Sequence, residues 1–310
     1  MITCISFKCS KAEELTVNPT RYVIITPARN EERAIEHTIR SVISQTIKPE
    51  KWVIVSDAST DRTDGIVQDY CKDYPFIRFI RSFNNQRRNF GSKVAAFNAG
   101  YVTLTDQQYE FIGNLDADVS FAPDYFANLI DRFARIPKLG VGGGLIQELV
   151  GSKFVAQDIS RNSVAGAVQF FRRRCFEDIG GYQALPGGGI DAVAEIMARQ
   201  RGWLVETFLD LYVHHHRRVT SGAGSVLATE FRHGQTAYRL GYQPLFALAT
   251  SMSRLPRRPY VIGAIAHSIG YSLGYLRRER VHLPRDTVKF LRAEQLQRLK
   301  HVVSKLRFTK

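Results

Sequence analysis

Short apolar runs alternate with helical patterns over the first 130 residues of the chain. Four runs have the length and composition of buried strands: Tyr22–Thr26, Trp52–Val55, Phe76–Ile80 and Phe111–Leu115. Between the first two runs, residues 31–46 carry apolar side chains at helical spacing. Such alternation predicts an α/β fold, with a mostly parallel sheet sandwiched by helices and joined by right-handed crossovers.

Polar residues follow three of these predicted strands. Residues 27–31 come after the first strand, Asp57 after the second, and Asp116 and Asp118 after the fourth. Because the carboxyl ends of parallel strands meet at one edge of a sheet, these residues are expected to line one cleft. The two aspartates offer hard oxygen ligands for Mg²⁺ or Mn²⁺ bound to a diphosphate. A solvated turn before the next helix is the alternative interpretation of this pair.

The middle of the chain is rich in glycine. Clusters at residues 140–144, 180–181 and 187–189 predict close backbone approach to a ligand, or a mobile loop. A helix is expected over Asp191–Arg201, and a further strand over Trp203–Val213 that leads into three consecutive histidines.

The C-terminal region changes character. Leu245–Leu255 and Tyr260–Leu276 are apolar and bounded by arginines, and the second stretch contains His267, serines and glycines. It is therefore a poor bilayer span, and a helix lying in the membrane interface fits better. Residues 251–310 hold 14 Lys and Arg against three acids, so +11 of the formal charge of +14 lies there. A strongly basic tail implies an anionic partner.

These shifts in composition divide the chain of 310 residues. We expect a loose lead-in over residues 1–20, a catalytic domain over 21–243, and a helical basic appendage over 244–310. Four scattered cysteines without a CxxC pair suit a reducing compartment, and the first ten residues do not resemble a secretory signal. A cytoplasmic location follows. GxGxxG and GxxxxGK[ST] motifs are missing, which argues against a dinucleotide-binding dehydrogenase and a P-loop NTPase.

Four polar segments follow one another along the chain: TPARNEE at 26–32, VSDASTDRT at 55–63, GSKVAAFNAG at 91–100, and the pair Asp116 and Asp118. Together they resemble family-2 glycosyltransferases of the GT-A fold, of the type that builds bacterial cell-surface polysaccharides. The order and spacing match over roughly residues 20–215. The resemblance implies a nucleotide-sugar donor, a divalent cation and a glycan or lipid-linked acceptor.

The resemblance also implies roles for the residues that follow the first two strands. Pro27, Arg29 and Glu31 would flank the nucleotide base and ribose, and Asp57 would face the base. The family usually has two acids at this last position, whereas this chain has Ser56 and Asp57.

The remaining donor and metal residues are implied in the same way. Lys93 looks like the lysine that contacts the diphosphate, and a solvated lysine at a helix start is the alternative. Asp116 would touch both ribose and metal, and Asp118 would ligate the metal directly. His215 and His216 are candidates for a further metal or phosphate ligand, because adjacent residues alternate across a strand.

Asp191 is the candidate general base. The family usually has Glu-Asp before a helix that ends in Arg and then Gly-aromatic, and here Ile190 replaces the glutamate. The reaction needs a carboxylate within hydrogen-bond reach of the acceptor hydroxyl, and direct displacement would invert the anomeric configuration. A helix N-cap is the alternative role. Arg217 or Arg218 could neutralise diphosphate charge.

Two other classes compete with an inverting glycosyltransferase. In a haloacid-dehalogenase-like phosphatase, Asp116 would be the nucleophile and Asp118 the acid/base, but that motif normally ends the first strand of its fold. A basic nucleic-acid-binding protein would explain the tail's charge. Long apolar stretches within the tail favour an anionic membrane surface instead, so we expect peripheral attachment to the inner face of the membrane and no nucleic-acid partner.

Overall fold

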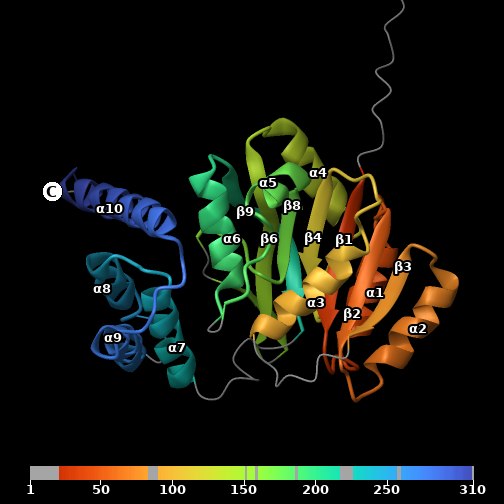
Figure 1. The fold of residues 1–310 in the computed structure, drawn as a ribbon, viewed down its shortest axis with the longest axis horizontal. Coiled ribbons are helices and arrows are strands. Elements are labelled where there is room, and N and C mark those ends of the chain that lie inside the picture. Colours follow the sequence, from red (N-terminus) through yellow and green to blue (C-terminus); the bar gives the residue numbers. More distant parts are fainter. Residues whose placement is uncertain are drawn as a thin grey trace, which may run out of the picture.

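The computed structural model describes residues 21–82, 90–150, 152–157, 160–185, 188–216, 226–256 and 260–308. The expected lead-in at residues 1–20 lies outside them. The described strands form one nine-stranded sheet with helices on both faces, and four C-terminal helices gather beside it (Figure 1).

The first half of the sheet is parallel, as predicted. Its strands pair in the order β3-β2-β1-β4. The strands and the helices between them are β1 (Tyr22–Ala28), α1 (Ile35–Ile43), β2 (Lys51–Asp57), α2 (Thr63–Asp73), β3 (Ile77–Ser82), α3 (Phe90–Val102) and β4 (Phe111–Leu115). Each crossover returns the chain to the same edge, so the loops after β1, β2 and β4 converge there.

The second half of the sheet is mixed. It contains β5 (Val119–Phe121), α4 (Tyr125–Arg135), β6 (Leu139–Val150), β7 (Lys153–Ala156), β8 (Val168–Arg172), α5 (Arg173–Asp178), α6 (Ile190–Gln200) and β9 (Leu204–His215). β8 lies antiparallel between β4 and β6, whereas β6 and β9 pair in parallel. Parallel pairing thus holds for half of the sheet and gives way to a mixed order where β8 joins it.

Alternation along the central strands builds one core on each face of the sheet. In β1, Tyr22 and Ile24 point into a core shared with α1 and α4, while Val23 and Ile25 point into a core shared with α3 and α6. All four side chains are fully buried. Burying an aliphatic side chain of this size contributes about 1.5–3 kcal/mol, so the strands that position the site lie in the most stable part of the chain.

The first glycine cluster is a correction to the sequence prediction. Residues 140–144 lie in the first half of β6 and are buried, so they are neither a mobile loop nor a ligand contact. A Cβ on Gly143 would lie 2.7 Å from the carbonyl oxygen of Val168 in β8. The glycines therefore permit close approach of neighbouring strands. Those strands come later in the chain, so the local pattern did not reveal the partner.

The C-terminal helices are α7 (Val226–Arg239), α8 (Pro244–Ser253), α9 (Val261–Leu276) and α10 (Arg285–Phe308). α7 precedes the predicted boundary at residue 244, yet it packs along α9 (Figure 1). α10 contacts α6, and Leu291 of α10 joins the core on the α3 and α6 face of the sheet. None of the described helices combines the length and apolar character that crossing a bilayer requires.

Candidate active site at the carboxyl edge of the sheet

Hydrogen bonds tie together the loops that follow β1 and β2. Pro27 is the penultimate residue of β1. Beyond it, the backbone N–H of Glu31 donates to Thr63 Oγ1 at 2.8 Å, and that of Glu32 donates to Asp61 Oδ2 at 3.1 Å. The buried Glu31 is therefore held at this edge by the start of α2.

Arg29 and Asp57 form an ion pair across the same two loops. Arg29 Nη1 lies 3.2 Å from Asp57 Oδ2, and the carboxylate is buried while the guanidinium is partly exposed. Pairing compensates the charge of the buried carboxylate. The structure thus brings together two of the residues predicted to contact the nucleotide.

Lys93 and Asp116 form a second ion pair at this edge. Lys93, in the first turn of α3, places its ammonium group 2.6 Å from Asp116 Oδ1, just after β4. Burial lowers the pKa of this ammonium group, but three carboxylates outweigh that effect and raise the pKa above its usual value: Asp116, Asp191 and Asp118. A charged lysine among carboxylates can bind an anion such as a diphosphate.

Asp118 pairs with His215. The antiparallel ladder between β5 and β9 places His215 opposite Val119, and its Nε2 lies 3.2 Å from Asp118 Oδ1. Burial lowers the pKa of His215, but the hydrogen bond and charge of Asp118 outweigh burial and raise that pKa overall. His215 Nδ1 is buried and has no hydrogen-bond partner within the described ranges.

His216 faces away from this pair, as alternation along a strand requires. Its Nε2 is 2.8 Å from Ser120 Oγ, and its ring stacks on His37 of α1 with centroids 4.4 Å apart. Of the two histidines predicted as metal ligands, the structure brings His215 to the aspartates and His216 to α1. Arg217 and Arg218, predicted to contact the diphosphate, lie outside the described residues.

A polar cavity of about 610 Å³ lies between the loop after β1 and the first turns of α1. It is lined by Asn30, Glu31, Glu32, Arg33, Ala34, His37, Asp61 and His216. Its volume is in the range of small-molecule sites. Glu31 and His216 therefore border a shared cavity, although His216 does not reach the aspartates.

Asp116, Asp118 and His215 are the candidate ligands for a cation at this edge. Their oxygen and imidazole donors suit a divalent transition ion such as Mn²⁺, and the carboxylates suit Mg²⁺. The described residues contain no cluster of three protein ligands already arranged around one point. The donor types therefore suit a divalent cation, and the protein groups alone do not complete its coordination.

Asp191 lies in the first turn of α6, two residues after the N-cap Gly189, so the predicted N-cap role falls to the glycine. Its side chain borders Gly166, where an added Cβ would lie 2.7 Å from Asp191 Oδ2. Asp191 is also near enough to Lys93 for its charge to raise that residue's pKa. The predicted base thus belongs to the same group of charges as the predicted diphosphate and metal residues.

A buried polar network behind Asp191 was not predicted from the sequence. Glu195, one turn further along α6, accepts hydrogen bonds from the backbone N–H of Val164 at 2.7 Å and from Gln169 Nε2 at 3.1 Å. Gln169 Oε1 in turn accepts one from Tyr182 at 2.7 Å. Helical spacing puts Glu195 on the same face as Asp191, and this pattern could have indicated Glu195 from the sequence. No pattern in the sequence indicates Gln169 or Tyr182.

Comparisons with known proteins bear on the family and the fold. The sequence model of glycosyl transferase family 2 matches residues 23–186, more than half of the chain. Poly-beta-1,6-N-acetyl-D-glucosamine synthase of Staphylococcus epidermidis is 28% identical over 170 residues, which cover 49% of this chain and 39% of that protein. Chondroitin synthase of Escherichia coli is 29% identical over 129 residues, covering 41% and 18%. The chain thus spans less than half the length of these relatives.

Two solved structures share the fold. A mannosyltransferase from Pyrobaculum calidifontis, in complex with GDP-Man and Mn²⁺, has a TM-score of 0.54 and 18% identity, covering 89% of this chain and 79% of its own. TarS of S. aureus with UDP-GlcNAc has a TM-score of 0.52 and 16% identity, covering 70% and 66%. The family match, together with the fold of these neighbours, shows that the chain belongs to glycosyl transferase family 2 and has the GT-A fold.

Proposed function

We propose that this chain is an inverting glycosyltransferase that moves a sugar from a nucleotide-diphosphate-sugar donor to a hydroxyl group of a glycan or lipid-linked acceptor. The observation that carries this function is the convergence of Lys93, Asp116, Asp118 and Asp191 at one edge of the sheet. Family membership leaves the haloacid-dehalogenase-like phosphatase without support.

The donor binds along the loops after β1, β2 and β4. Pro27, Arg29, Glu31 and Asp57 surround the base and ribose, and the Arg29–Asp57 pair fixes the two loops relative to each other. Lys93 leaves its present partner Asp116 and binds the diphosphate, so its ammonium group stays paired with negative charge. The cation would then compensate the charge of Asp116.

Asp116, Asp118 and His215 would hold a divalent cation, Mg²⁺ or Mn²⁺, at the diphosphate. Such an ion supplies charge neutralisation as the diphosphate leaves. The protein itself contributes two effects at this point. Lys93 stabilises the same negative charge, and the 3.2 Å contact with His215 holds Asp118 in place before the ion binds.

Asp191 takes the proton of the acceptor hydroxyl. The hydroxyl oxygen forms a bond to the anomeric carbon, the bond from that carbon to the diphosphate oxygen breaks, and its electron pair leaves with the nucleoside diphosphate. Attack from the side opposite the leaving group inverts the anomeric centre. Gly166 leaves room for the carboxylate beside the segment that precedes β8, and Gln169 donates to the backbone oxygen of Asp191 at 3.4 Å.

The C-terminal helices hold the enzyme at the anionic inner face of a membrane. α9 buries one face, with Ala264, His267 and Tyr271, and leaves the opposite face apolar but exposed, with Ile262, Ile265 and Ile269 about half exposed. Neighbouring α8 exposes Leu245, Leu248 and Met252. Large apolar patches beside basic residues suit an interfacial helix pair better than a nucleic-acid surface. This role assigns residues 21–243 to catalysis and the region after 243 to attachment, with α7 as the helix on which α9 packs.

A donor screen by thermal shift tests the catalytic function. UDP-, GDP- and dTDP-sugars are added with and without Mn²⁺, beginning with UDP-GlcNAc and GDP-mannose, the sugars bound by the structural neighbours. Bound donor stabilises the folded chain by mass action, so one nucleotide class should raise the melting temperature. Asp118→Ala should lose the part of that increase that depends on the metal. If none of the donors stabilises the protein, the proposed transferase activity is wrong.

A further inference from the structure

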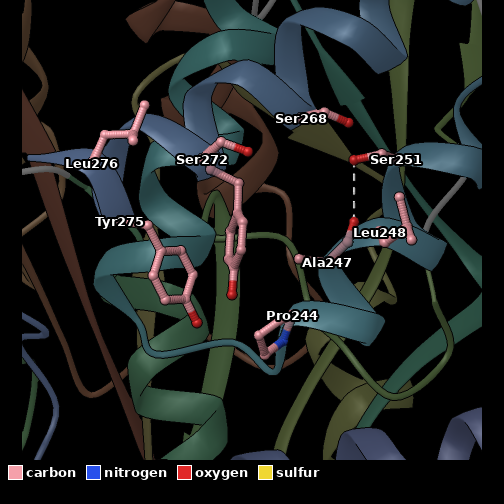
Figure 2. A pocket seen from close by; sticks show the side chains of 9 residues that line it. Pro244, Ala247, Leu248, Ser251, Ser268, Ser272, Tyr275 and Leu276 are labelled. Carbon is pink, nitrogen blue, oxygen red and sulfur yellow. Dashed lines mark hydrogen bonds between the residues drawn. The ribbon is translucent and has the colours of Figure 1, made fainter.

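A cavity of about 460 Å³ lies between α8 and α9, apart from the sheet edge that carries the candidate active site. Figure 2 shows side chains from both helices around it. The lining residues are Pro244, Ala247, Leu248, Ser251, Ser268, Tyr271, Ser272, Tyr275 and Leu276. The volume is within the range of small-molecule sites.

The two buried polar residues at this cavity, Ser251 and Tyr271, already have partners inside the protein. Ser251 Oγ donates to the carbonyl oxygen of Ala247 at 3.1 Å and lies 2.8 Å from His267 Nδ1. The hydroxyl of Tyr271 donates to the carbonyl oxygen of Tyr242 at 2.8 Å. The walls of the cavity are therefore mainly carbon, which favours an apolar occupant.

The cavity opens onto the exposed apolar face of the two helices. Leu248 and Leu276 line it and are themselves 55% and 78% exposed. Ile269 and Met252 extend the same kind of surface along α9 and α8. An occupant that fills the cavity would thus continue into an apolar layer outside the protein, as a hydrocarbon chain in a bilayer does.

Positive charge follows immediately after the cavity residue Leu276. Arg277, Arg278 and Arg280 are exposed, and no carboxylate pairs with Arg277 or Arg278 within the part of the chain that the structure describes. The intervening Glu279 is bound to Arg239 at 2.7 Å. The end of α9 is therefore complementary to an anion, and like charge opposes pairing of this face with a second copy of itself.

We propose that the cavity between α8 and α9 binds one acyl chain of an anionic phospholipid, whose phosphate lies at Arg277 and Arg278. This site rests on the membrane attachment proposed above and names the lipid contact within it. A single chain held in a cavity, rather than a flat apolar surface alone, makes attachment depend on the shape of α8 and α9.

Monomeric short-chain lipid distinguishes a cavity from a surface. The full chain is titrated by calorimetry with dihexanoyl phosphatidylglycerol below its micellar concentration, and with the matching phosphatidylcholine. We expect one phosphatidylglycerol per protein and at least tenfold weaker binding of phosphatidylcholine. Arg277→Gln combined with Arg278→Gln should remove most of this preference.

Two variants fill the cavity without touching the core. Ser272 is exposed and Ser268 half-buried, so Ser272→Phe and, separately, Ser268→Phe should fold and should weaken lipid binding at least tenfold. The control is Ser253→Phe, the same change at an exposed residue of α8 outside the lining. Equal binding by the filled variants and the control, or no binding by the unaltered chain, would overturn the lipid site.

Vesicle co-sedimentation and donor binding are measured on the same preparations. They distinguish failure of the acyl-chain site from failure of membrane attachment and from failure of the transferase function. If vesicles containing phosphatidylglycerol still bind the protein while cavity filling has no effect, membrane attachment stands and the acyl-chain site is wrong. If vesicles do not bind at all, the attachment itself is wrong. Donor-induced stabilisation reports on the transferase function independently of both results.

Discussion

Two helices show how differently the chain uses the same apolar pattern. α4 lies on the sheet and buries Phe126, Leu129 and Phe133, whereas α9 lies on α7 and exposes Ile262 and Ile265 on its other side. The sheet covers the whole apolar face of α4, but the small core of the C-terminal helices covers only one side of the apolar surface of α9. An apolar stripe thus indicates which residues avoid water, and it does not indicate what covers them.

The edge of the sheet and the C-terminal helices also differ in their proposed roles, which are catalysis and membrane attachment. Charged groups with perturbed pKa values gather at the edge of the sheet, and exposed apolar groups gather on the helices. If the two regions have the two roles proposed above, variants in one region should leave the property of the other unchanged. Four experiments, from the largest expected effect to the smallest, test the roles of these groups.

Asp191→Asn should have the largest effect. Without a base for the acceptor hydroxyl, turnover should fall about 100- to 10,000-fold, while donor-induced stabilisation and vesicle binding persist. Steady-state assays of nucleotide release with donor and acceptor measure it. Asp210→Asn is the matched control, because Asp210 is an exposed residue of β9 that pairs with Arg132. Near-normal turnover in Asp191→Asn would remove Asp191 as the base.

Gly166→Ala should lower turnover by about 100-fold, because the new methyl group displaces the Asp191 carboxylate from its position. The KM for the donor should change little, since Gly166 does not belong to the donor loops. Gly65→Ala in α2 is the control, as a Cβ there meets nothing within 4 Å. A helical alanine should leave activity unchanged and stabilise that variant slightly. Equal activity of both variants would show that Asp191 has room to move.

Ile265→Glu combined with Ile269→Glu should weaken binding to anionic vesicles at least tenfold. Both residues are about half exposed on α9, and the change removes apolar contact and adds charge of the same sign as the lipid. Val102→Glu with Val155→Glu makes the same charge change at exposed positions of the sheet region. If both pairs reduce vesicle binding alike, net charge rather than the α9 surface directs attachment.

Glu195→Gln should have the smallest effect, on the pH dependence of stability. Burial raises the pKa of Glu195 from 4.5 to about 7, so the folded state binds this proton more tightly than the unfolded state. The stabilisation is complete below pH 4.5 and is lost as pH rises to about 7. Glutamine does not titrate, so the variant does not lose this stabilisation. The difference between the melting temperature of the variant and that of the unaltered chain should therefore rise by a few degrees between pH 5 and pH 8. Parallel melting curves would contradict this.

The sequence was sufficient to predict the parallel half of the sheet and to predict that the ends of its strands meet at one edge. Runs such as the one ending in Asp116 are buried on both faces, and the periodicity of the sheet dictates where their polar ends meet. Alternation in β9 also required that His215 and His216 face opposite ways, but not which of them meets Asp118.

The rest depended on contacts between distant segments. Gly143 fits against β8 some 25 residues later, which no local rule connects to it. Likewise, Glu195 bonds to Val164 and Gln169 across a loop, so its burial could not be read from its own helix. Long-range packing decides such cases, and one sequence contains no direct record of it.

The contact between α6 and α10 makes the tail hard to exchange. Arg199 of α6 lies 3.8 Å from Glu195 and 2.9 Å from Glu294 of α10, and Leu291 fills part of the core beneath. A chain shortened at Tyr242, or one given the tail of another family member, would lose a counter-charge and a core side chain next to the helix that carries Asp191. The attachment region is therefore not a removable module: a graft between enzymes of this kind must move α6 and α10 together.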